Sequence, residues 1–67
     1  MKYIIRANPL QAEPPTYWLP QNKGSYVRTA DINQAFARGF ATRADARAYM
    51  DGHGVAESPI NEIIEVQ

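Results

Sequence analysis

Three pairs of neighbouring large apolar residues constrain this chain more than any other feature: Ile4-Ile5, Tyr17-Trp18 and Ile63-Ile64. Each pair lies in a segment rich in the β-branched and aromatic residues that are typical of strands. Successive side chains of a strand point to opposite faces of its sheet, so each pair places one large apolar group on each face. We therefore expect a sheet that is apolar on both sides, of which a single strong helix would cover only one.

Prolines and glycines separate the strand-like segments from one another. We predict strands over residues 2–7, 16–19, 25–29 and 60–66. The connection between the first two is irregular, because its prolines cannot donate to a sheet ladder. Gly24 is suited to a tight turn, so residues 16–29 should form a hairpin.

Two helix starts precede the last strand. Thr42-Arg43-Ala44-Asp45 resembles a capping box with Asp in place of the usual Glu or Gln, and the helix should run to about Asp51. Asp31 can cap a shorter helical turn that ends near Gly39. The order β-β-β-α-β predicts an α+β fold, a small antiparallel sheet with one main helix packed on one face. We place the first and last strands side by side at the centre of the sheet.

The length of 67 residues allows one domain, residues 1–67. A core of this size rarely supplies more than about 3–5 kcal/mol. The chain has no cysteine, so neither a disulfide nor a thiolate metal site can add to it. Small domains without disulfides or metals often gain further stability by associating with a second chain. We find no signal-peptide pattern and no apolar run of membrane-spanning length, and we expect a cytoplasmic location.

The net charge is zero, but the charges are unevenly distributed. Residues 1–47 carry seven basic and three acidic side chains, whereas residues 48–67 carry four acidic ones and no basic one. One interpretation is complementary pairing across the sheet. The other is a dipolar surface that steers a charged partner.

The sequence offers little for catalysis, and we predict no enzyme, cofactor or metal. His53 is the only imidazole, and its position between two glycines after the main helix is typical of a helix end. Glu62 and Glu65 should lie on opposite faces of the last strand, so they cannot converge as a hydrolytic pair.

Binding is better supported, because the hairpin combines aromatic residues with arginine, as protein interfaces do. The residues we select first are Tyr17, Trp18, Tyr26 and Arg28, and the secondary candidates are Arg43, Arg47 and Glu65. Either Tyr17 or Trp18 must be a core residue. The same hairpin can stack nucleic-acid bases, but a pI of about 6.5 makes nucleic acid the less favoured partner.

The open sheet face leads to a second expectation. Large apolar patches rarely stay exposed in monomers, so this face should support a homodimer or a docked partner. The alternative is that the loop over residues 9–15 folds back and covers it.

The chain also resembles a class of short phage and prophage proteins. Their pattern is an opening strand, an aromatic hairpin with Trp, an Ala-x-x-Phe segment, a Thr-capped helix and a closing Ile/Val strand. The matching pieces here are residues 2–5, Tyr17-Trp18, residues 37–42, residues 44–48 and residues 63–66. Some anti-CRISPR proteins are similar in size and in α/β build.

That resemblance implies a stoichiometric inhibitor that binds a CRISPR effector complex in the host cytoplasm. The chain departs from the acidic, DNA-mimicking members because its charge balances to zero. The resemblance therefore favours mixed polar and aromatic contacts over imitation of a phosphate backbone. The alternatives are a small nucleic-acid-binding or regulatory protein and a structural accessory subunit.

Overall fold

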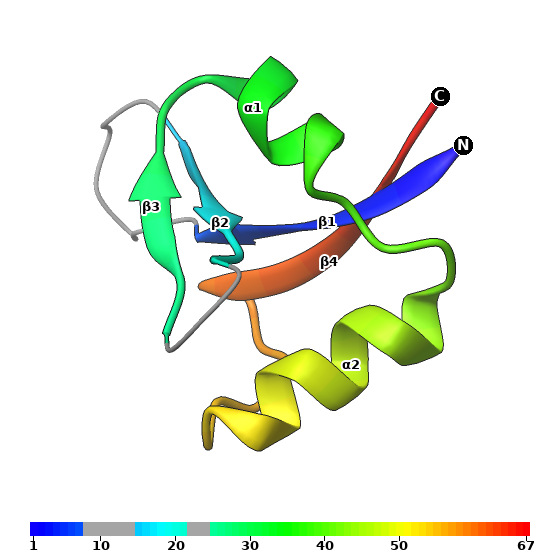
Figure 1. Ribbon diagram of the computed structural model, residues 1–67. Helices are drawn as coiled ribbons and strands as arrows, with labels where there is room; N and C mark the ends of the chain where they lie inside the picture. Colours follow the sequence, from blue (N-terminus) through cyan, green and yellow to red (C-terminus); the bar gives the residue numbers. More distant parts are fainter. Residues whose placement is uncertain (8–14, 22–24) are drawn as a thin grey trace.

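The computed structural model describes residues 1–7, 15–21 and 25–67. Over these residues the chain forms four strands and two helices (Figure 1). They are, in order, β1 (Lys2–Ala7), β2 (Thr16–Leu19), β3 (Val27–Thr29), α1 (Ile32–Ala37), α2 (Arg43–Gly52) and β4 (Asn61–Val66). The strands make one antiparallel sheet in the order β3-β2-β1-β4. The predicted α+β class with one main helix is confirmed.

The first and last strands are neighbours, as expected, but they are not both central. β1 and β4 align over their whole length, from Lys2 opposite Val66 to Ala7 opposite Asn61. The hairpin of β2 and β3 pairs on the other side of β1, which leaves β4 at an edge of the sheet. The apolar pattern correctly indicated which strands meet. It carries no information on how many neighbours each strand has, and the central position predicted for β4 was wrong.

A short segment between the helices completes the sheet beside β1. Tyr3 and Phe40 donate their backbone N–H groups to each other's carbonyl oxygens, both at 2.8 Å. Gly39 makes this approach possible, because a Cβ atom there would lie 3.1 Å from the Phe36 carbonyl oxygen and 3.2 Å from the Lys2 Cβ. The chain passes the sheet at this point, and the two helices lie on opposite sides of it (Figure 1).

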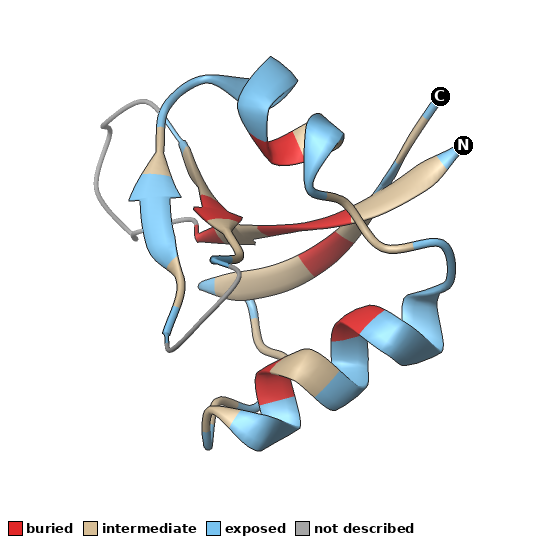
Figure 2. Ribbon diagram, in the orientation of Figure 1, coloured by how far each residue is buried: buried red, intermediate tan, exposed pale blue. Residues whose placement is uncertain are grey.

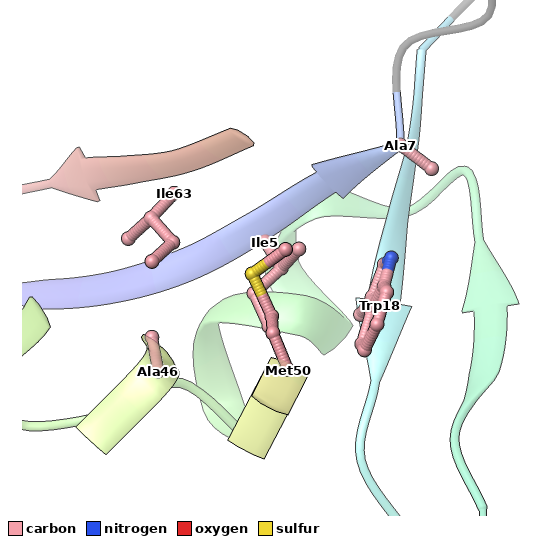
Figure 3. Packing of buried hydrophobic residues seen from close by; sticks show 6 residues of the cluster. All are labelled: Ile5, Ala7, Trp18, Ala46, Met50 and Ile63. Carbon is pink, nitrogen blue, oxygen red and sulfur yellow. The ribbon is translucent and has the colours of Figure 1, made fainter. Parts of the chain in front are cut away.

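The main core lies between α2 and one face of the sheet. Ala46 and Met50 of α2 are fully buried. They pack against Ile5, Trp18 and Ile63, which come from three different strands (Figure 3). Burying large apolar side chains in this way supplies the main stabilisation of a small domain.

The opposite face is covered in part by α1, more than the sequence indicated. Lys2 and Ile4 alternate with the α2-facing residues of β1, so they point to this second face. The Lys2 ammonium lies 5.2 Å from the centre of the Phe36 ring. Ile4 and Ala35 are each only 1% exposed. Figure 2 shows buried segments on both β1 and α1. The expectation that one helix would leave this whole face open therefore needs correction.

Both predicted helix starts are confirmed. The Thr42 hydroxyl accepts a hydrogen bond from the Asp45 N–H at 3.1 Å, and the Asp31 carboxylate accepts one from the Asn33 N–H at 2.9 Å. Over β4 the second face carries the ion pair of Arg6 with Glu62. Most of the loop that could cover this region falls outside the described residues.

Candidate protein-binding surface

An aromatic cluster forms where the β2–β3 hairpin meets the end of α2. The rings of Trp18 and Tyr26 stack in parallel with centroids 3.6 Å apart. The His53 ring lies 5.4 Å from that of Tyr26 and 4.5 Å from that of Tyr49. Such contacts stabilise beyond simple area burial and fix the ring orientations. The cluster therefore joins Tyr26, just before β3, to the end of α2 through packed rings.

Trp18 is the core member of the Tyr17-Trp18 pair. It is 1% exposed, and its indole N–H donates to the Asn61 side-chain oxygen at 3.3 Å. Its buried ring supports Tyr26 from beneath. Tyr17 is half-buried and lies opposite Arg6 and Thr29 in the register, on the other face of the sheet. The hairpin residues selected from the sequence thus divide between two faces.

Tyr49 carries an unsatisfied group within the aromatic cluster. Its hydroxyl is buried and has no hydrogen-bond partner among the described residues. Burial of this hydroxyl, together with the nearby Tyr26, raises the pKa of Tyr49 above its ordinary value. The ring itself contacts His53 and Phe40, with centroids 4.5 and 5.3 Å away. The ring contacts therefore stabilise the position of Tyr49, whereas burial of its hydroxyl costs free energy.

Arg28 is exposed on β3, opposite Trp18 in the register and therefore on the same face as Tyr26. Within the described part of the chain its side chain makes no hydrogen bond or ion pair. The other described arginines all do. Arg6 pairs with Glu62, and Arg38 donates to the Pro20 carbonyl oxygen at 2.9 Å. Arg28 is thus the described arginine best placed to bind something else.

Arg43 and Arg47 hold the loop that follows α2. Their guanidinium groups lie 3.6 and 3.3 Å from the two carboxylate oxygens of Glu57. Arg43 also donates to the Ile63 carbonyl oxygen at 3.4 Å and lies over the Tyr3 ring. Both arginines remain more than half exposed, so they form a solvated and internally paired face.

Glu65 lies apart from the hairpin. It is exposed on β4, opposite Tyr3, at the other edge of the sheet from β3. The structure therefore brings together Trp18, Tyr26 and Arg28, and it separates them from Tyr17 and Glu65.

Two residues near the hairpin were not selected from the sequence. Val27 is 50% exposed, an unusual value for a valine in a strand, and it points to the face opposite Arg28. His53 was interpreted as a helix end, which it is, but it also packs against the aromatic rings. The alternation of Tyr26, Val27 and Arg28 was the available signal for Val27, whereas nothing in the sequence linked residue 53 to the hairpin.

A shallow groove lies on the other face, between α1 and β2. Its volume is about 320 Å³, and it is lined by Leu19, Gln34, Ala37 and Arg38. Among the described residues, its lining includes no acid, base or nucleophile arranged as a catalytic group. In the described residues no set of three potential metal ligands comes together, and no helix is long and apolar enough to cross a membrane.

Comparisons with family models, with curated proteins and with solved structures find no match to this chain.

Proposed function

We propose that this chain is a non-enzymatic binding protein that acts through a hairpin surface formed by Tyr26, Arg28 and His53. The observation that carries the proposal is the exposed Arg28 beside an aromatic cluster that the core already holds in place. Aromatic residues and arginine are the side chains enriched at interface hot spots. A surface that is rigid before binding loses less conformational entropy on binding.

The distribution of charge favours a protein partner over nucleic acid. Tracking a phosphate backbone requires several free cations on one surface. In the described residues Arg6, Arg43 and Arg47 already pair with carboxylates. The whole chain has no net charge. Arg28, which pairs with none of the described residues and lies beside aromatic rings, matches a mixed polar and aromatic protein interface.

The resemblance to short phage proteins supports a more specific version of the proposal. The partner is then a CRISPR effector complex in the cytoplasm of the host cell, and the protein inhibits it stoichiometrically. The small size and the separate, preformed hairpin surface are consistent with occupation of a site on a larger protein.

Self-association is a separate expectation. Ile64 and Val66 are half-exposed on the part of the second face where β4 lies. A homodimer through this region stays a prediction, and the mass of the native protein in solution tests it. A monomer at micromolar concentration would exclude it.

The inhibitor version is tested with purified, nuclease-treated effector complexes in a target-DNA cleavage assay. We expect cleavage to fall in proportion to added protein and to stop at a one-to-one ratio. Arg28→Glu should relieve the inhibition, whereas Arg47→Glu, on a different surface, should not. Undiminished cleavage at a tenfold excess of the protein, across effector types, would refute this version.

A further inference from the structure

Over the described residues, the hydrogen-bonding pattern shows which backbone groups at the edges of the sheet lack a partner. Tyr3 uses its N–H and C=O groups to bind Phe40 on the hairpin side of β1. Because these groups alternate in direction along an antiparallel strand, Ala7 also directs its groups to that side and bonds to Thr16. By the same alternation Tyr17 and Leu19 bond to β3.

Arg28 is therefore the residue of β3 whose backbone faces outward. Thr29 and Val27 lie opposite Tyr17 and Leu19, so they use their N–H and C=O groups within the sheet. Arg28 lies between them and directs both groups to the outer edge. In the described part of the chain neither Tyr26 nor Ala30, on either side of β3, makes a main-chain hydrogen bond to another backbone group.

The other edge of the sheet is longer and is protected over residues 61–63, while Glu65 also directs its backbone groups outward. Asn61 of β4 directs its backbone groups outward, and Ser58 satisfies both, at 2.9 and 3.0 Å. The next outward residue is Ile63, whose carbonyl oxygen accepts a hydrogen bond from the Arg43 guanidinium at 3.4 Å. Covering an edge with a turn and a charged side chain is a common protection against strand pairing. β3 has no such cover among the described residues.

We propose that β3 is a strand-addition site that binds an extended segment of a partner protein with an acidic residue opposite Arg28. The inference rests on the proposed protein-binding function and specifies its mode. Backbone hydrogen bonds to Arg28 supply the pairing, and the side chains supply specificity. A carboxylate opposite Arg28 forms a cross-strand ion pair.

The neighbours of that acidic residue should be apolar. In the added strand they point to the opposite face, where Val27 is 50% exposed. Ile32, the first residue of α1, is 39% exposed and adds apolar surface close to β3. The site thus fits an alternating segment with one acidic side chain between two β-branched ones.

A second copy of this chain is a poor occupant of the same edge. Antiparallel pairing of two β3 strands about their central residue would place Arg28 directly opposite Arg28. Like charges in that position are destabilising. The sequence of β3, with its central arginine, is therefore suited to an acidic partner and not to itself.

Amide hydrogen exchange measured by NMR tests whether the edge is open. In the free protein the Arg28 amide should exchange much faster than those of Val27 and Thr29, because only theirs are bonded within the sheet. An Arg28 amide as protected as its two neighbours would overturn the inference.

Peptide binding tests the chemistry of the site. The probe is a seven-residue peptide with valine at positions 1, 3, 5 and 7, threonine at 2 and 6, and glutamate at 4. At ten times its Kd it should slow exchange of the Arg28 amide about tenfold. A matched peptide with lysine at position 4 should bind about fivefold more weakly or worse. The Arg28→Glu variant should bind the lysine peptide more tightly than the glutamate peptide.

Two results would refute strand addition at β3. One is a glutamate peptide that leaves the amides of residues 26–30 unshifted at millimolar concentration. The other is an unchanged preference in the Arg28→Glu variant, whose exposed position leaves the fold intact. A partner protein whose binding shifts the side-chain signals of Tyr26, Arg28 and His53 but leaves the Arg28 amide exchanging as fast as before would overturn this inference and leave the proposed function standing. Peptide binding at β3 without any protein partner would support the inference and count against the proposed function.

Discussion

The buried hydroxyl of Tyr49 leads to a quantitative prediction about the free energy of unfolding. A buried polar group without a partner costs about 1–3 kcal/mol. Tyr49→Phe removes that group and keeps the ring contacts with Phe40 and His53. We therefore expect the variant to be more stable by about 1 kcal/mol, which is a large share of the roughly 3–5 kcal/mol available to a core of this size. In a domain of this length the midpoint of thermal unfolding should rise by about 4–8 °C.

Urea unfolding followed by Trp18 fluorescence provides the assay, since Trp18 is the only tryptophan and is buried in the same cluster. The matched control is Tyr17→Phe, which removes a hydroxyl from a half-buried tyrosine on the other face and should change stability by less than about 0.5 kcal/mol. A Tyr49→Phe variant that is less stable than the wild type by 1 kcal/mol or more would refute the reasoning. It would show that the hydroxyl makes a hydrogen bond in the native state.

Four further predictions concern pH, packing, backbone contact and capping. The pKa of Tyr49 is raised in the folded state, so ionisation of its hydroxyl favours the unfolded chain. Folding stability is therefore unaffected by this group below its ordinary pKa of 10.0 and falls as the pH rises from there through the pKa of the folded state. Urea midpoints at increasing alkaline pH should fall more steeply for the wild type than for Tyr49→Phe. Met50→Ala removes a fully buried side chain and should cost about 2–5 kcal/mol, enough to unfold much of the population, as circular dichroism would show. Gly39→Ala should destabilise by about 1–3 kcal/mol in urea unfolding, because the added methyl group meets the Phe36 carbonyl oxygen at 3.1 Å. Thr42→Ala removes the cap of α2 and should cost about 1 kcal/mol in the same assay, with Ala44→Ser on the exposed face of the helix as a control of small effect. A Met50→Ala or Gly39→Ala variant as stable as the wild type would contradict the packing described for that residue.

The sequence predicted the elements that depend on local signals. The Thr42 cap and the strand segments were accessible because capping and alternation act within a few residues. The division between Tyr17 and Trp18 was not, because alternation places them on opposite faces without indicating which face the main helix covers. Gly39 was interpreted only as the end of a short helical turn, but it also lets Phe40 pair with β1.

The candidate site depended more on distant contacts, and the sequence predicted less of it. Tyr26 and Arg28 were found from composition alone. The pairing of Arg43 and Arg47 with Glu57 joins a helix to a loop ten or more residues away, beyond the reach of any local pattern. The same holds for His53, which reaches the hairpin only after α2 has docked.

Quantitative affinity capture from nuclease-treated bacterial lysate containing CRISPR effector complexes tests the central claim most directly. The wild type, Arg28→Glu and Arg47→Glu are compared as bait, with the recovered proteins measured by mass spectrometry. We predict that the wild type and Arg47→Glu retain the same protein at a one-to-one ratio, and that Arg28→Glu loses it. Equal recovery by all three baits, or binding that appears only when nuclease is omitted, would contradict a protein-binding surface centred on Arg28.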